Sequence, residues 1–160
     1  MYEKILVPLD GSKVGEAALE DVEELVSKFA PETEVEVTLF QVISSLTPSV
    51  VAGESRASIP HTKQEMEQIK KKTIDYLSEA GKGLRSKGAV VRARVKTKMG
   101  IGNAAEEIIK AANDINASLI AISTHGSSGL TRWAFGSVTD KVLRGANVPV
   151  LMVRALKQAK

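Results

Sequence analysis

The spacing of apolar residues along the chain predicts strands and helices in alternation. Lys4–Pro8 is a short apolar run, as in a strand that is buried on both faces of a parallel sheet. The apolar residues of 13–29 recur every three or four positions, which is typical of an amphipathic helix. A run rich in β-branched residues predicts a second strand over 34–42. The chain therefore opens as a strand–helix–strand unit.

The rest of the chain continues this alternation. Helical spacing occurs at 62–87, 104–116 and 137–145, and strand-like runs occur at 90–96, 118–123 and 148–153. In the first of these strands, apolar residues alternate with Arg92, Arg94 and Lys96, which indicates a wetter face at or near a sheet edge. Five strands and four helices predict one α/β domain over 1–160, with a mostly parallel open sheet and helices on both faces.

The segment 43–61 interrupts this pattern. It contains Pro48, Gly53, Pro60 and several serines, and loops of this length in compact domains are usually functional or disordered. We interpret it as a flexible loop. Three roles stay open for it: a cover near a ligand site, a contact for a partner, or a disordered insertion.

Composition removes several classes of function. The chain has no cysteine, which excludes disulfides, thiol catalysis and cysteine-ligated metals. No apolar run is long enough to span a membrane and no signal peptide follows Met1, so we expect a cytoplasmic protein. The net charge is +3, but aromatic residues make up only 4%, which leaves few platforms for stacking bases. We therefore expect no nucleic-acid partner.

Candidate chemistry is concentrated in 118–140. A strand-like run leads into a loop with Gly126 and Gly129, and Gly136-Ser137 then opens a helix. Glycines let the backbone approach an anion, and free N–H groups at a helix start bind phosphate. A structural interpretation is also open, in which the glycines are turn residues and Ser137 forms a capping box with Asp140. The spacing matches neither G-x-G-x-x-G nor the P-loop pattern with its lysine.

A second candidate, Asp10, follows the first predicted strand. Ligands of open α/β sheets bind at the carboxyl ends of the strands, where this carboxylate would lie. Its structural alternative is a helix cap, a role that is open to Ser12 as well. Gly100 and Gly102 also precede a predicted helix, but we interpret them as a tight turn.

The stretch 118–140 resembles the nucleotide loop of ATP-binding universal stress proteins. That loop has the pattern G-x-x-G, nine residues, G-[ST], and this chain has Ser123-Thr-His-Gly126, the nine residues 127–135, and Gly136-Ser137. Ser123 stands where the family pattern has its first glycine. The stretches Lys4-Ile-Leu-Val-Pro-Leu-Asp10-Gly-Ser12 and Val148-Pro-Val-Leu-Met-Val153 extend the resemblance over nearly the whole chain.

The resemblance implies a Rossmann-like sheet with strand order 3-2-1-4-5. Its switch point would lie between the first and fourth strands, which would bring Asp10 beside the nucleotide loop. The resemblance also implies that Asp10 faces the ribose of ATP and that the backbone around Val42 lies beside the adenine. It implies a homodimer through the final strand 148–153, whose apolar edge would favour pairing. The alternative is a strand covered by helices and by Trp133 and Phe135.

We predict that the N–H groups of 126–128 and 137–139 hold the phosphates. Because the loop has no lysine, a divalent cation, Mg²⁺, would neutralise the phosphate oxygens. Arg132 is either a further phosphate ligand or an ordinary exposed arginine. No catalytic residue and no protein ligand for a metal is predicted. The hydroxyl groups at 127, 137 and 139 would add hydrogen bonds to the phosphates. The predicted nucleotide contacts are Asp10, Val42, Ser123, His125, Gly126, Ser127, Gly129, Gly136, Ser137, Val138 and Thr139.

The first functional hypothesis is an ATP-binding regulator or sensor in stress response. The second is a nucleotide-independent dimeric interaction protein. Ser123 favours it, because a Cβ there could crowd a ligand, whereas Gly126, Gly136 and Ser137 oppose it. The third is a slow ATPase with His125 as general base, although this side chain could instead hold the loop through a backbone hydrogen bond. We expect at most slow hydrolysis.

Overall fold

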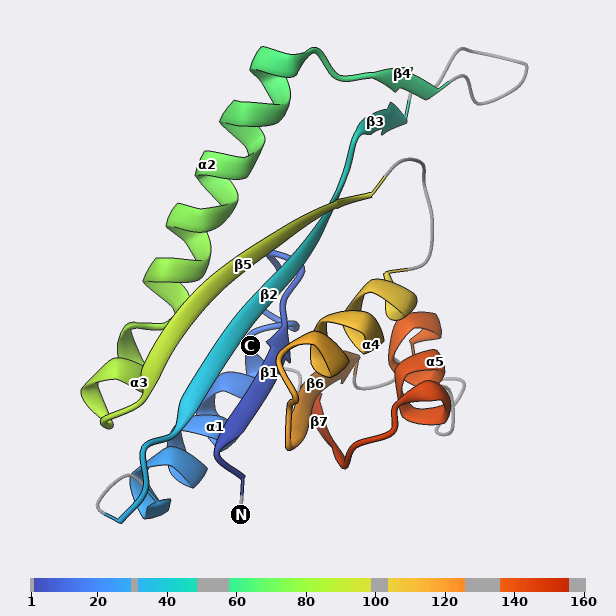
Figure 1. Cartoon of the computed structure of the whole chain (residues 1–160). Helices are drawn as coiled ribbons and strands as arrows, with labels where there is room; N and C mark the ends of the chain where they lie inside the picture. The colour runs from blue at the N-terminus through green and yellow to red at the C-terminus, as the bar shows by residue number, and fades with distance from the viewer. Residues whose placement is uncertain (1, 30–31, 49–57, 99–103, 126–135, 156–160) are drawn as a thin grey trace, which may run out of the picture.

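The computed structural model describes residues 2–29, 32–48, 58–98, 104–125 and 136–155 (Figure 1). The strands of the main sheet are β1 (Lys4–Pro8), β2 (Glu36–Ser44), β5 (Val90–Lys98), β6 (Leu119–His125) and β7 (Val150–Ala155). The helices are α1 (Ala17–Phe29), α2 (Lys63–Ala80), α3 (Lys82–Ser86), α4 (Ala105–Asp114) and α5 (Ser137–Gly145). None of these helices combines the length and the apolarity that crossing a membrane requires.

The five strands lie in the order β5-β2-β1-β6-β7, and every neighbouring pair is parallel. Counted along the chain, this is the order 3-2-1-4-5, so the predicted topology is confirmed. The order reverses between β1 and β6, which makes the gap between their carboxyl ends the switch point of the sheet.

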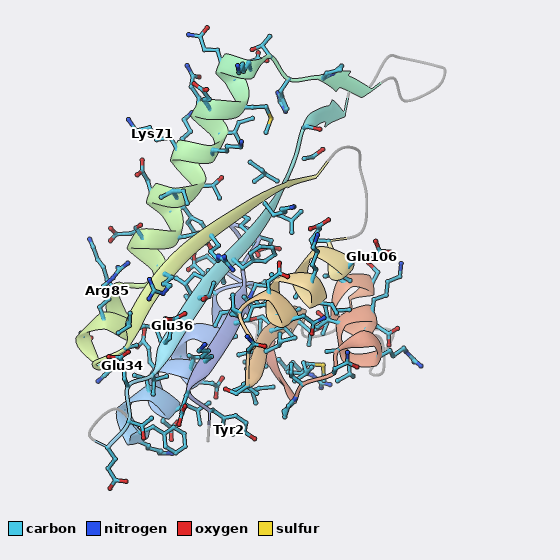
Figure 2. The ribbon with its side chains drawn as sticks, viewed as in Figure 1. Tyr2, Glu34, Glu36, Lys71, Arg85 and Glu106 are labelled. Atoms are coloured by element: carbon cyan, nitrogen blue, oxygen red, sulfur yellow. The ribbon has the colours of Figure 1, made fainter. Side chains whose placement is uncertain are left out.

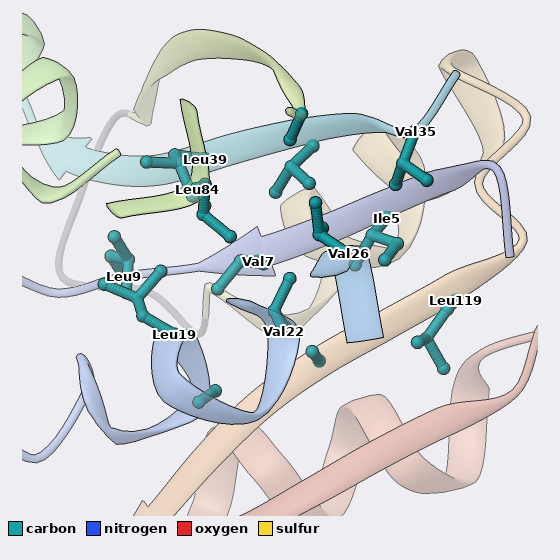
Figure 3. Close-up of a cluster of buried hydrophobic side chains, with 14 of the residues drawn as sticks. Ile5, Val7, Leu9, Leu19, Val22, Val26, Val35, Leu39, Leu84 and Leu119 are labelled. Atoms are coloured by element: carbon teal, nitrogen blue, oxygen red, sulfur yellow. The ribbon is translucent and has the colours of Figure 1, made fainter. Parts of the chain in front are cut away.

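Helices cover both faces of the sheet, as predicted. α1, α2 and α3 pack on one face, where their buried side chains meet Ile5 and Val7 of β1 (Figure 3). α4 and α5 pack on the other face, against Leu6 of β1 and Ile120 of β6. Successive side chains of a strand point to opposite faces, and Ile5, Leu6 and Val7 are each 0% exposed. The apolar run of β1 is therefore explained by burial on both sides.

β5 is an edge strand, as its charge pattern predicted. Its charged side chains at 92, 94 and 96 are exposed, and Arg92 Nε lies 2.9 Å from Glu36 Oε2 on β2. Charges on an edge strand oppose pairing with a second sheet. The lysines at 70–72 of α2 are exposed too, and Figure 2 shows Lys71 projecting away from the sheet. These basic residues thus occupy solvated faces.

The predicted single helix 62–87 is divided at Gly81 into α2 and α3. A Cβ on Gly81 would lie 2.8 Å from Val91 Cγ1 and 3.2 Å from Leu39 Cδ1, so the backbone here touches the sheet directly. The break lets α3 bring Leu84 into the core, where it is 0% exposed. The single-helix prediction was wrong because periodicity does not show where a helix must bend to stay on a sheet.

The segment 43–61 also differs from the predicted loop. β2 continues to Ser44, which pairs with Lys98 of β5. A short antiparallel pair follows, formed by β3 (Leu46–Pro48) and β4 (Ser58–Pro60). Residues 49–57 lie outside the described part of the chain. Both ends of the segment 43–61 therefore form strands, the first by extending β2 and both by the β3–β4 pair.

Candidate functional site

A cavity of about 270 Å³ opens at the carboxyl ends of β1 and β6. This is the switch point at which open α/β sheets bind ligands. Its apolar wall is formed by Phe40, Val42, Ala104, Ile108, Ile122 and Val138. Its polar side chains are Asp10, Ser123, Ser137 and Thr139, and the lining is completed by Pro8, Leu9, Gly15 and Gly136. An apolar slot with a few convergent polar groups is typical of a small-molecule site.

The Asp10 carboxylate is held by the turn that follows it. Asp10 Oδ1 accepts hydrogen bonds from the Ser12 amide at 2.9 Å and from the Ser12 hydroxyl at 2.6 Å. The Ser12 hydroxyl accepts in turn from the Gly15 amide at 3.0 Å, and Gly11 has a φ of +83°, which favours glycine. Because this turn occupies the residues before Ala17, α1 starts later than the predicted residue 13. The turn presents an exposed carboxylate at the cavity.

The hydroxyl of Ser123, near the end of β6, is bonded to the start of α1. It accepts a hydrogen bond from the Ala18 amide at 2.8 Å and donates one to the Gly15 carbonyl at 2.8 Å. The backbone carbonyl of Ser123 accepts from the Thr139 hydroxyl of α5 at 3.3 Å. Ser123 therefore joins β6 to helices on opposite faces of the sheet. The Thr139 hydroxyl, which we predicted as a phosphate ligand, is already bonded within the protein.

The first turn of α5 has no side-chain cap. Gly136 is its N-cap residue, with φ −57° and ψ 148°, and Asp140 pairs with Arg144 Nε at 3.0 Å instead of closing a capping box. The capping-box interpretation is therefore wrong. By contrast, Thr62 caps α2 at nearly the same backbone angles, φ −65° and ψ 160°, by accepting from the Glu65 amide at 3.2 Å. Within the described residues, no side chain caps the N–H groups at the start of α5, which is the arrangement that an anion can bind.

Two buried polar atoms, Gln41 Oε1 and Tyr76 OH, have no hydrogen-bond partner among the described residues. A Cβ added to Gly11 would lie 4.0 Å from Gln41 Nε2, so Gln41 lies beside the Asp10 turn. Burial raises the pKa of Tyr76 above its usual range, and the nearby carboxylate of Glu16 adds to the effect. The phenol is therefore neutral at physiological pH.

Comparison with known proteins decides the family. The model of the universal stress protein family matches residues 1–154. The chain belongs to this family. Universal stress protein MJ0577 of Methanocaldococcus jannaschii is 31% identical, and the match covers 96% of each chain. Universal stress protein YxiE of Bacillus subtilis is 32% identical, and the match covers 96% of this chain and 100% of the relative.

Solved structures of the family share the fold over nearly the whole chain. The structure of MJ0577 has a TM-score of 0.70 and 26% identity, with 99% of each chain covered. A universal stress protein from Archaeoglobus fulgidus in complex with dAMP has a TM-score of 0.57 and 24% identity, covering 95% of this chain and 98% of that one. Another, in complex with cAMP, has a TM-score of 0.61 and 18% identity, covering 96% and 97%. The last two likenesses show the fold alone.

The cavity of this family member brings together residues that are far apart in the sequence. Of the predicted nucleotide contacts, Asp10, Val42, Ser123, Gly136, Ser137, Val138 and Thr139 line it. His125 ends β6, where its backbone pairs with Ala155. The other predicted contacts, Gly126, Ser127 and Gly129, lie outside the described residues, as do Arg132, Trp133 and Phe135.

Sequence reasoning missed part of the lining. Phe40 precedes Val42 by two positions on β2, so strand alternation places both on one face and could have revealed it. Ile108 lies in the helix that was predicted over 104–116, but it was not among the predicted nucleotide contacts. Nothing in the sequence indicated that Gly15 lines the site. Its φ is not positive, so the backbone conformation does not explain the glycine either. Its necessity comes from Asp10: a Cβ on Gly15 would lie 2.5 Å from the Asp10 Oδ1 atom.

Proposed function

We propose that this cavity binds an adenine nucleotide, ATP or a close relative, and that the protein is a regulator or sensor in stress response. One arrangement carries the proposal: an apolar slot, a fixed carboxylate and an uncapped helix N-terminus converge at the switch point. Family membership supports it, and so do the dAMP and cAMP complexes of proteins with the same fold.

The base would lie in the apolar slot. Phe40, Val42 and Ile108 would form the apolar walls that contact the purine. The backbone around Val42 would read the base edge by hydrogen bonds, so side-chain identity there matters little. Because these groups recognise adenine rather than the phosphate tail, the slot does not by itself select ATP over ADP, AMP or a cyclic nucleotide.

The ribose and phosphates would occupy the polar side. Asp10 would accept a hydrogen bond from a ribose hydroxyl, and its exposed position leaves room for that contact. The N–H groups of 137–139, which no side chain of the described residues caps, would hold phosphate oxygens. The glycine loop at 126–129 and the Ser127 and Ser137 hydroxyls would contribute further hydrogen bonds. No cluster of three acidic, His or Cys side chains that could hold a metal occurs among the described residues, so Mg²⁺ would be bound mainly by the phosphates.

Two further elements belong to the proposal. One is a homodimer through β7, an outer strand whose apolar residues are only half-buried, beside a groove lined by Tyr2, Leu25 and Leu151. A strictly monomeric mass by sedimentation equilibrium at high protein concentration would argue against it. The other is a cytoplasmic location, where adenine nucleotides are abundant.

The decisive experiment is to denature freshly purified protein and identify released nucleotide by chromatography, followed by titration with Mg²⁺-ATP. We expect binding that Asp10→Ala weakens roughly 10- to 100-fold, the value of a hydrogen bond to a charged group. Asp75→Ala is the matched control, because Asp75 is an exposed carboxylate on α2. If no nucleotide is released and millimolar Mg²⁺-ATP gives no binding heat, the nucleotide-independent interaction protein replaces this proposal.

The same preparation separates a binding protein from a slow ATPase. Phosphate release above the level of contaminants, lost in His125→Ala while nucleotide binding stays intact, would assign a catalytic role to His125. Unchanged release in that variant would show hydrolysis that does not depend on His125, and no release would leave regulation by occupancy as the function.

A further inference from the structure

The hydroxyl of Ser123, on β6, caps the start of helix α1. The first amides of a helix have no carbonyl within the helix to bond with. Ala18, in the first turn of α1, instead donates to Ser123 Oγ at 2.8 Å, across 105 positions of sequence. The same hydroxyl donates to the Gly15 carbonyl at 2.8 Å. One oxygen atom of β6 thus bonds both an amide of the first turn of α1 and a carbonyl of the turn that precedes it.

From Gly15 a short chain of contacts leads to Asp10. The Gly15 amide donates to the Ser12 hydroxyl at 3.0 Å, and this hydroxyl donates to Asp10 Oδ1 at 2.6 Å. Gly15 also packs against the carboxylate so closely that a Cβ would lie 2.5 Å from Asp10 Oδ1. Any shift of Gly15 therefore shifts the carboxylate.

The other side of Ser123 faces the phosphate side of the cavity. Its carbonyl accepts from the Thr139 hydroxyl at 3.3 Å, and the neighbouring Thr124 hydroxyl accepts from the Gly136 amide at 3.4 Å. Thr139 and Thr124 are 4% and 2% exposed, so water competes little for these bonds. The end of β6 consequently holds the start of α1 and the start of α5 in one fixed relation.

We infer that Ser123 is a positioning residue: its hydroxyl fixes Asp10 relative to the start of α5, and so sets the selectivity of the site for nucleotides with ribose hydroxyl groups. This inference rests on the proposed nucleotide function. It also assigns a role to the residue that departs from the family glycine, because a glycine cannot make these two bonds.

The test compares ATP with 2′,3′-dideoxy-ATP by calorimetric titration. The wild type is expected to prefer ATP by roughly 10- to 100-fold, through the bond to the Asp10 carboxylate. In Ser123→Ala, which keeps the Cβ and removes the hydroxyl, this preference falls roughly three- to tenfold, while affinity for the dideoxy nucleotide changes little. Ser123→Thr restores the preference because it restores the hydroxyl.

Ser118 provides a matched control at the opposite end of β6. Its hydroxyl accepts from the Lys4 amide at 3.1 Å and donates to the Lys4 carbonyl at 3.0 Å, so it makes the same pair of bonds away from the cavity. Ser118→Ala should leave the ATP preference unchanged. In an Asp10→Ala background, Ser123→Ala should also change nothing, because the group that Ser123 positions is gone.

The possible outcomes separate the inference from the function. If the wild type binds neither nucleotide, the proposed function fails and the inference fails with it. If the wild type prefers ATP and Ser123→Ala keeps that preference in full, the inference alone is overturned. Amide exchange gives a ligand-free readout: Ala18 should exchange roughly fivefold faster in Ser123→Ala than in Ser118→Ala. Equal exchange rates would show that the hydroxyl does not hold the turn.

Discussion

The uncapped start of α5 gives a prediction in which stability and binding move in opposite directions. Gly136 has the backbone angles φ −57° and ψ 148°, and Thr62 at φ −65° and ψ 160° shows that a hydroxyl side chain caps a helix from such a backbone in this protein. A Cβ on Gly136 would meet no atom within 4 Å among the described residues. Gly136→Ser should therefore fit without strain and cap the helix.

The expected gain in stability has two parts. Replacing glycine at a compatible backbone position stabilises a protein by about 0.4–1 kcal/mol, because the unfolded chain loses freedom. Serine exceeds glycine as an N-cap by a few tenths of a kcal/mol. Because the N-cap difference already includes part of this loss of freedom, the two values overlap, and the free energy of unfolding should rise by about 0.3–1 kcal/mol, measured by urea denaturation with an unchanged m-value.

Nucleotide affinity should fall in the same variant. The new hydroxyl would accept from the amide of Val138 or Thr139, which the phosphate is proposed to use. Competition for a bond to a charged group costs about 1.5–3 kcal/mol, or roughly 10- to 100-fold in affinity for Mg²⁺-ATP. Gly136→Ala separates competition by the new hydroxyl from crowding by the new Cβ, because it adds the Cβ without the cap.

A cap elsewhere provides the control. Thr62→Ala removes the cap of α2 and should lower stability by about 1 kcal/mol while leaving the affinity for ATP unchanged. If Gly136→Ser raises stability but binds ATP as tightly as the wild type, the phosphate does not use the start of α5. If Gly136→Ser lowers stability, a hydroxyl at position 136 does not cap α5 in the way that Thr62 caps α2.

Two other predictions concern stability away from the cavity. Tyr76→Phe should raise the free energy of unfolding, or leave it unchanged, because the buried hydroxyl makes no well-formed hydrogen bond within the described residues. A loss above about 1 kcal/mol in urea titration would show instead that the nearby Glu16 carboxylate or Gly11 backbone bonds to it. Hydrogen bonds from Thr62 lower the pKa of Glu65. The stability that the Glu65 carboxylate contributes is therefore complete above the unfolded-state pKa of 4.5 and is lost as pH falls through the lower folded-state pKa. Glu65→Gln should therefore flatten the acid side of the stability–pH profile, and an unchanged profile would contradict this assignment.

The sequence predicted the architecture because its elements differ in how they are buried. β1 has an uninterrupted apolar run because Ile5, Leu6 and Val7 are all fully buried, whereas β5 alternates because it is an edge strand. The order of the strands came only from the family resemblance. The break at Gly81 could not be located, because it depends on contacts with Leu39 and Val91 that follow from the packed sheet.

The site was predicted where it follows strand ends and was missed where it depends on contacts. Asp10 and Ser123 lie at the ends of β1 and β6, so topology alone brings them together. The role of the Ser123 hydroxyl could not be predicted, because its partners, Gly15 and Ala18, are 108 and 105 positions away in the chain. As a sequence feature, Ser123 was only a departure from a glycine pattern.

Gly136 differs from Gly81 and Gly15 in a way that bears on the nucleotide hypothesis. A Cβ on Gly81 would crowd Val91 Cγ1 at 2.8 Å, and a Cβ on Gly15 would crowd the Asp10 carboxylate at 2.5 Å, so neighbouring side chains favour glycine at both positions. Gly136 has ordinary backbone angles and open space around it, so neither conformation nor packing within the described residues demands a glycine there. A ligand that approaches the backbone closely would supply the missing reason. If such a ligand is ATP, the added Cβ of Gly136→Ala should lower the affinity for Mg²⁺-ATP, whereas unchanged affinity would show that the nucleotide does not approach the backbone closely at Gly136.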